Sequence, residues 1–169
     1  RISEDKVIES ENRLSSLIEN LDCAVLLEDE NRKIILTNSK FCKLFNIPIS
    51  PDLLKGEDSL AAANENKHLF KYPEDFISRT TNIFEKKQQV LGDELIMADG
   101  EIFERDFIPI LKGSEYKGHL WTFKNITLRK KYGESLEAHK HKYYNIIAKF
   151  LKKIIIVKKG SPTRMNLKQ

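Results

Sequence analysis

The segment 19-ENLDCAVLLEDENRKIILTNSKFCKLFNI-47 decides the fold of this chain. Two short runs within it, 24–28 and 33–37, are rich in leucine and branched side chains and flank the polar turn 29–32. Runs of this kind around a polar turn predict an antiparallel hairpin. Asn38 is suited to cap a short helix after the second run, because the apolar residues that follow recur at helical spacing.

The residues before this segment predict an amphipathic helix. Val7, Leu14 and Leu21 repeat every seven residues, and Leu17 and Ile18 fill the same stripe. Two heptads fit either a short coiled coil or a helix that packs on its own domain. Because one domain need not cover the whole stripe, we expect a homodimer formed through the flanking helices.

The residues after this segment predict a longer helix and three more strands. Pro73 opens the helix, whose apolar spacing continues to Val90. Strands are predicted at 94–97, 102–111 and 116–127, the first ending in an Asp-Gly hairpin turn.

A further helix is predicted from Leu128 through Ala148. The complete order predicts an α+β fold with a five-stranded antiparallel sheet, short helices on one face, and amphipathic helices at both ends.

Three segments together resemble the PAS family of sensor domains. They are the segment 19–47, 98-ADGEIFERDFIPI-110 with its glycine turn and fourth strand, and 118-GHLWTFKNITLRKK-131 with the last strand and its exit. The resemblance covers about residues 13–130. It implies a cytoplasmic sensory module of a sensor histidine kinase or a related two-component phosphorelay regulator, in a parent protein that is soluble or membrane-anchored elsewhere. The division expected from it is an N-terminal helix at 1–21, a PAS core at 22–128, a signalling helix at 129–148 and a basic tail at 149–169.

The exit motif departs from the family at one position. Asn125, followed by Ile126 and Thr127, stands where the family usually has Asp. In the family, that Asp commonly ties the sheet to the outgoing helix through a charged contact. Asn accepts hydrogen bonds but carries no charge, so we expect the coupling here to be weaker or to use another contact.

No pattern in the sequence predicts catalysis. Phosphate-binding glycine loops, GxSxG and HExxH are absent. His139 and His141 lack the acidic residue and the proline that would follow a kinase phosphoacceptor. We therefore expect this chain to be no enzyme, within a parent that is a histidine kinase.

No cofactor is identified either. Cys42 lies on an earlier helix than the reactive cysteine of flavin-binding PAS domains, and the long helix lacks the histidine that haem-binding ones supply. His68 precedes that helix and is insufficient alone. Four scattered histidines give no metal site, and Cys23 and Cys42 are expected as reduced thiols.

A small-molecule pocket is the remaining candidate site. Strand alternation places Val25 with Leu27, and His119 with Trp121, on shared faces, and by resemblance to PAS domains these faces line a cavity under the helices. The candidate pocket residues are Leu95, Met97, Phe103, Arg105, Phe107, Trp121 and Phe123. They form either a ligand pocket or a packed core.

Arg105 is the unusual member of this set, since a buried guanidinium is costly unless it is paired. It is either an anchor for an acidic ligand or part of an internal ion pair, and the second interpretation is favoured. A register slip that exposes it is the third.

Charge is concentrated at the C-terminal end. Residues 149–169 hold seven basic and no acidic residues. The rest of the chain therefore has a net charge of −3, which does not favour a nucleic-acid surface there. The tail is either a basic contact for membranes or nucleic acid, or a non-native or truncated end. The second is favoured because the family pattern stops at Ala148. Besides the PAS reading, a ligand-free dimerisation module is the main alternative function.

Overall fold

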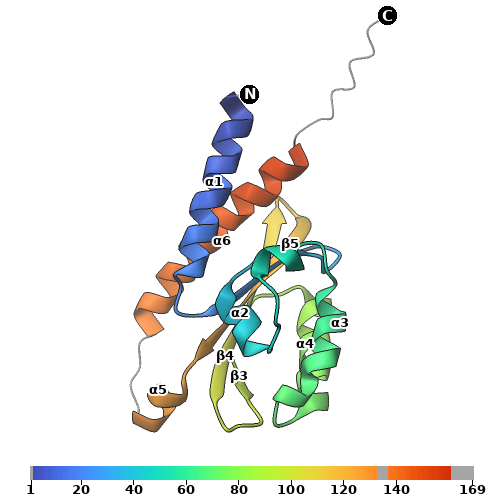
Figure 1. The fold of residues 1–169 in the computed structure, drawn as a ribbon, viewed down its shortest axis with the longest axis vertical. Helices are drawn as coiled ribbons and strands as arrows, with labels where there is room; N and C mark the ends of the chain where they lie inside the picture. Colours follow the sequence, from blue (N-terminus) through green and yellow to red (C-terminus); the bar gives the residue numbers. More distant parts are fainter. Residues whose placement is uncertain (1, 133–136, 161–169) are drawn as a thin grey trace, which may run out of the picture.

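A computed structural model describes residues 2–132 and 137–160. Its centre is a five-stranded antiparallel sheet of strand order β2-β1-β5-β4-β3 (Figure 1). The strands are β1 (Ala24–Asp29), β2 (Ile34–Thr37), β3 (Val90–Ile96), β4 (Ile102–Lys112) and β5 (Glu115–Asn125). The α-helices are α1 (Ile2–Glu19), α2 (Ser39–Leu44), α3 (Ser59–Asn66), α4 (Pro73–Lys86), α5 (Thr127–Tyr132) and α6 (Glu137–Gly160), and the 3₁₀ helices are η1 (Pro51–Leu54) and η2 (Lys67–Leu69). The predicted α+β fold is confirmed.

Asn38 begins α2 as predicted and also connects that helix to two other elements. Its side-chain oxygen accepts from the backbone N–H of Phe41 in the helix and from that of Val25 in β1, both at 3.1 Å. Its amide nitrogen donates to the carbonyls of Ile18 and Cys23 at 2.9 Å. One fully buried side chain therefore joins α1, β1 and α2.

Two element ends differ from the prediction. The long helix ends at Lys86, because Lys87 adopts a left-handed backbone with φ of 50°. Val90, predicted in that helix, starts β3 and pairs with Phe107 on β4. The last strand ends at Asn125 instead of reaching Thr127, which is the first residue of α5.

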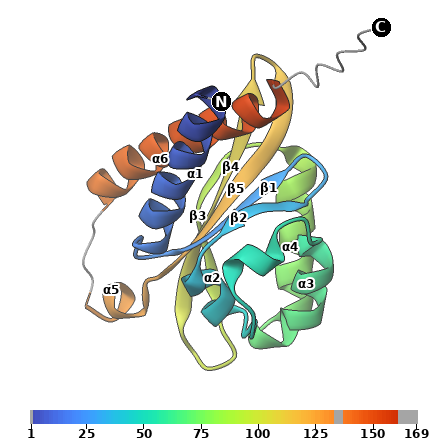
Figure 2. The same cartoon turned by 45° about the horizontal axis from the view of Figure 1, so that its top comes forward.

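Helices cover both faces of the sheet, as Figure 2 shows. We call the face toward α2, α3 and α4 the inner face, and the face toward α1 and α6 the outer face. Each face carries its own cluster of buried apolar side chains. The short helices lie on one face as predicted, and the flanking helices close the other.

Helix α1 packs on its own domain. Leu14, Ile18 and Leu21 are buried against the outer face, whereas Leu17 keeps 60% of its surface exposed. Most of the stripe from which dimerisation was predicted is thus covered within one chain. Dimerisation stays a prediction, with Leu17 as the exposed residue that could support it.

Helix α6 continues through the predicted boundary at Ala148. Leu151 and Ile155, assigned to the tail, are buried with Tyr144 against the outer face. They recur at a spacing of four, so one helical face is apolar although lysines lie between them. The origin of the tail stays a prediction, and residues 161–169 lie outside the described part of the chain.

Candidate functional site

The seven predicted pocket residues all lie on the inner face. Six of them, all except Arg105, belong to its apolar cluster, and Arg105 is buried with 1% exposure. Six of the seven come from β3, β4 and β5, whose predicted strand alternation is correct, and Met97 directly follows β3, where it forms an isolated bridge with Phe70. The exposed-register interpretation of Arg105 is therefore wrong.

The predicted face of β1 was wrong. Val25 and Leu27 lie in the outer cluster with α1 and α6, and Ala24 and Leu26 face inward instead. Every residue from Ala24 to Glu28 is buried, because helices cover both faces of this strand. A strand that is apolar on both sides shows no alternation from which its inner face could be read.

A cavity of about 40 Å³ lies between the inner face and the helices. Arg105, Trp121 and Phe123 line it, whereas the other four predicted residues pack elsewhere in the core. The remaining lining residues come from β1, the turn after it and the helices: Leu26, Arg32, Phe41, Phe45, Ile47, Ser59, Ala62, Ala63, Asn66, Phe76 and Thr80. The cavity is thus built chiefly by helical residues that the strand pattern could not reveal.

Arg105 is held by an internal ion pair, as the favoured interpretation expected. Its Nε donates to Asp93 at 2.9 Å, and its Nη2 lies 2.6 Å from the same carboxylate oxygen. Its Nη1 donates to the hydroxyl of Thr80 on α4 at 2.6 Å. Burial lowers the pKa of Arg105, and the charge of Asp93 opposes that shift.

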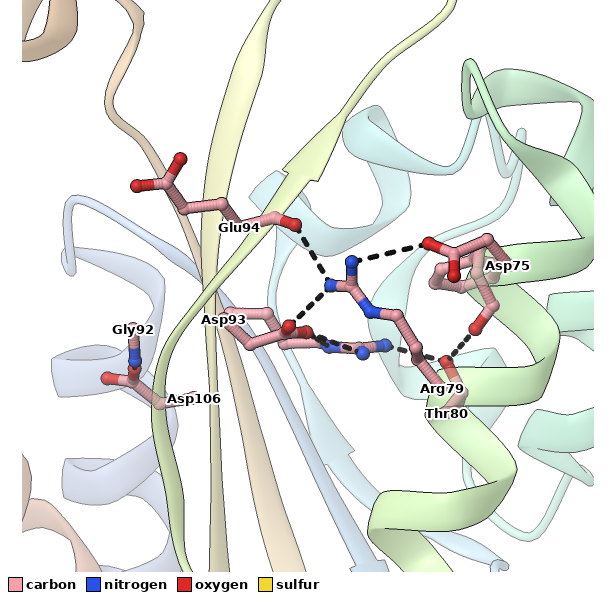
Figure 3. A network of polar contacts seen from close by, with 9 residues as sticks. Asp75, Arg79, Thr80, Gly92, Asp93, Glu94 and Asp106 are labelled. Atoms are coloured by element: carbon pink, nitrogen blue, oxygen red, sulfur yellow. Dashed lines mark hydrogen bonds and ion pairs between the residues drawn. The ribbon is translucent and has the colours of Figure 1, made fainter.

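Asp93 also binds a second arginine, Arg79 of α4, as Figure 3 shows. Arg79 further donates to the backbone carbonyl of Glu94 at 2.9 Å and to Asp75 at 3.3 Å. Burial alone would lower the pKa of Arg79, but its contacts with Asp93 and Asp75 outweigh burial and raise it. This network fixes α4 to the edge of the sheet formed by β3 and β4.

A second buried polar cluster was missed by the sequence reasoning. His119 and Glu28, both fully buried, are paired across β5 and β1. Trp121 donates its indole N–H to the same Glu28 oxygen at 3.0 Å, and the Tyr116 hydroxyl contacts the other ring nitrogen of His119. Burial and the charge of Glu28 raise the pKa of Tyr116. Since Trp121 also lines the cavity, this cluster connects the cavity wall to β1.

Arg32 and Ser59 are the cavity residues least expected from the sequence. Arg32 belongs to the predicted polar turn 29–32, yet it is only 8% exposed, and Ser59 is 6% exposed. Arg32 has a left-handed backbone with φ of 62°, and its carbonyl accepts the backbone N–H of Ser59 at 3.3 Å. A turn pattern predicts the chain reversal but not the helix that covers it.

A larger groove of about 640 Å³ lies beside the exit of the sheet. Met97, Phe103 and Phe123 contribute to its walls, together with Asn125. Lysine, histidine and acidic side chains also line it: Asp22, Lys40, Lys43, His68, Asp99 and Glu101. Five of the seven predicted pocket residues therefore line one or both of these spaces, and Leu95 and Phe107 line neither.

The exit motif fastens α5 to the start of β4. Asn125 accepts from both the backbone N–H and the hydroxyl of Thr127, at 3.0 and 2.6 Å. Thr127 in turn accepts the backbone N–H of Ile102 at 3.0 Å, and the Ile126 N–H donates to the Ile102 carbonyl at 2.8 Å. Arg129 adds a charged contact with Glu104. Arg129 thus supplies the charged contact that Asn125 cannot make. This agrees with the expectation that the coupling uses another contact.

Within the described residues, no three His, Cys, Asp or Glu side chains are grouped so as to hold a metal ion. The described helices include none with the length and apolar character needed to cross a membrane. The side chains of His139 and His141 lie outside the described residues.

Comparison with known proteins identifies one family model, described as a PAS domain, which matches residues 12–77. The PAS domain of BvgS from Bordetella pertussis is 12% identical, with a TM-score of 0.52 over 82% of this chain and 96% of that one. A PAS domain from Colwellia psychrerythraea is 18% identical, with a TM-score of 0.46 over 70% and 98% of the two chains. The PAS domain of histidine kinase ThkA is 17% identical, with a TM-score of 0.45 over 62% and 99%. No curated protein sequence is significantly similar to this chain.

Proposed function

We propose that this chain, in which a PAS-domain family model matches residues 12–77, is a PAS-type, non-catalytic sensory module that relays a change in its core to the flanking helices. The observation that carries this proposal is that the two faces of one sheet pack against different elements. The inner face borders the cavity, and the outer face of the same strands carries α1 and α6.

Trp121 and its neighbours illustrate how the two faces are linked. Trp121 lines the cavity, while Leu120, the residue before it, is buried in the outer cluster. Leu151 of α6 belongs to that same cluster. Because packed interiors tolerate few voids, a displacement of β5 on one side changes the packing on the other.

The parent protein is a further part of the proposal. We propose a sensor histidine kinase or a related two-component regulator located in the cytoplasm, with its output domain beyond α6. The resemblance of the exit segment 118–131 to the exit of PAS domains supports an output domain after it. A downstream kinase partner and a homodimer through α1 and α6 belong to the same proposal, and no nucleic-acid partner is included.

The relay is tested by filling the cavity without a ligand. Ala63 lines the cavity on α3, whereas Ala61 on the same helix is exposed. Spin labels at two exposed positions, Leu17→Cys on α1 and Phe150→Cys on α6, report the distance between the helices in a background with both native cysteines replaced by serine. Ala63→Leu should shift or broaden that distance distribution, and Ala61→Leu should leave it unchanged.

An unchanged distribution in the Ala63→Leu protein, with the fold intact by circular dichroism, would contradict the relay. It would favour the alternative function, a ligand-free dimerisation module, in which core and flanking helices are independent.

A further inference from the structure

The charged side chains in the described wall of the cavity are positive. Two arginines line it, and no Asp or Glu is found among the described residues of its wall. Arg105 is neutralised by Asp93. Arg32 forms no ion pair with any residue in the described part of the chain, although more than nine-tenths of it is buried.

Three polar atoms of the cavity residues have no hydrogen-bond partner among the described residues, and one of them, Nη2 of Arg105, still forms an ion pair with Asp93; the other two matter here. These two are Nε of Arg32 and the hydroxyl oxygen of Ser59, both inaccessible to solvent. Leaving a buried donor unpaired costs free energy, and a buried cation without a counter-charge costs more. The face of the Arg32 guanidinium is partly compensated by the Phe84 ring, whose centroid lies 4.8 Å away. That contact supplies neither a hydrogen bond nor a negative charge.

Apart from Asn66 and Thr80, the rest of the wall is apolar. Phe41, Phe45, Ala62 and Ala63 line the cavity on the side of the helices. A volume of about 40 Å³ holds on the order of three water molecules, which corresponds to a small organic molecule of about four heavy atoms. Flavins, haem and aromatic acids are too large for it.

From these features we infer that the cavity binds a short-chain monocarboxylate of the size of acetate, with its carboxylate on Arg32 and Ser59. The carboxylate provides the missing counter-charge and accepts from Nε and from the hydroxyl. Its methyl group packs on the alanines and phenylalanines. This inference rests on the proposed function, since it names the signal that the cavity would receive.

Trp121 gives a direct readout of binding. It is the only tryptophan of the chain, and it lines the cavity. In the ¹⁵N-labelled 169-residue protein, the Trp121 indole resonance is followed while sodium acetate replaces sodium chloride at constant ionic strength. Acetamide, which has nearly the same shape but no charge, is titrated in parallel. We expect a saturable shift with acetate and none with acetamide.

Variants locate the carboxylate. Arg32→Gln should raise the Kd for acetate at least about tenfold, since a charge-assisted hydrogen bond is lost; Ser59→Ala should raise it less. Lys33→Gln removes the adjacent positive charge, which is exposed and lies 3.9 Å from Asp58, and should leave the Kd unchanged. Gln at position 32 has the same backbone strain as Arg, because both side chains have a Cβ that meets the same steric hindrance at that φ.

Three results would overturn the inference: no saturable shift with acetate, an equal response to acetamide, or an Arg32→Gln protein that binds as tightly as wild type. The first indicates that acetate does not enter the cavity, the second that charge plays no part in binding, and the third that the carboxylate does not lie on Arg32. Acetate binding without any change in the α1–α6 distance would instead uphold the inference and reject the relay. If Ala63→Leu changes the α1–α6 distance but the protein does not bind acetate, the relay is upheld and the inference is rejected.

Discussion

Arg129, in the helix that leaves the sheet, donates a 2.7 Å hydrogen bond to the carboxylate of Glu104 on β4. The two side chains are 20% and 8% exposed. Asn125 carries no charge with which to hold this helix, and Arg129 provides the charged contact four residues later. The connection between sheet and outgoing helix therefore includes a charged pair in addition to the contacts of Asn125, Ile126 and Thr127.

Breaking this pair should loosen α5. We expect Arg129→Gln to lower the free energy of unfolding by about 1 kcal/mol, between the values for exposed and buried pairs. Amide hydrogen exchange in α5 should accelerate. Arg13→Gln removes the same charge from an exposed pair with Glu9 on α1 and should change neither quantity. Equal exchange in both variants would show that the Arg129–Glu104 pair does not hold α5.

Substitution of Asp93 should reduce stability more than substitution of most other charged residues. Asp93→Asn leaves Arg105 buried without its carboxylate and also releases Arg79. We expect a loss of about 3 kcal/mol in the free energy of unfolding by urea, as for other buried pairs that lose one partner. Asp75→Asn, at a carboxylate that is 54% exposed, should cost less than about 0.5 kcal/mol. Similar losses for both would mean that Arg105 is solvated in solution.

The docking of α6 on the outer face predicts a contrast between adjacent residues. Leu151 is fully buried and Phe150 is 51% exposed. Leu151→Ala should reduce stability by about 2–4 kcal/mol through lost burial and the space left behind. Phe150→Ala should change it by less than about 0.5 kcal/mol. If thermal unfolding shows the same stability for both variants, α6 does not pack on the sheet.

The homodimer prediction now rests on Leu17. Leu17→Glu should weaken association, measured by sedimentation equilibrium, while the melting temperature of the monomer stays the same, because the side chain is 60% exposed. Leu14→Glu should instead destabilise the fold, because Leu14 is buried. A monomer mass for wild type at high micromolar concentration contradicts the prediction directly.

Alkaline pH should destabilise the protein partly through Cys23. Burial raises the pKa of this thiol from its ordinary value of 9.0 to about 11. The folded state therefore favours the neutral thiol, so its contribution is complete below pH 9 and is lost as the pH rises toward 11. Two pKa units correspond to about 2–3 kcal/mol. In Cys23→Ala, the free energy of unfolding by urea should decline less steeply from about pH 8 to pH 11 than in wild type. An equal decline in both proteins would contradict the raised pKa of Cys23.

Much of the fold could be predicted because its signals are local. The turn at 29–32, the cap at Asn38 and the Asp-Gly turn before β4 each depend on neighbouring residues, and each appears where it was predicted. The alternation of β4 and β5 placed Arg105 and Trp121 on the inner face correctly. Where local signals were ambiguous, as at Val90, the pairing with Phe107 across the sheet decided between helix and strand.

The sequence by itself determined the order of the elements, the antiparallel sheet and the alternation that places Arg105 on one strand face with Phe103 and Phe107, because these follow from periodicity and turn chemistry. Only the tertiary structure decided that Asp93 pairs with Arg105, that Arg32 of a polar turn is covered, and that α6 closes the outer face. The physical reason is that a side chain's partners and solvent exposure depend on residues distant in the chain. Arg32 shows this most clearly: its turn is encoded by four adjacent residues, but its burial depends on Ser59 and Phe84, which reach it only when α3 and α4 fold onto the sheet.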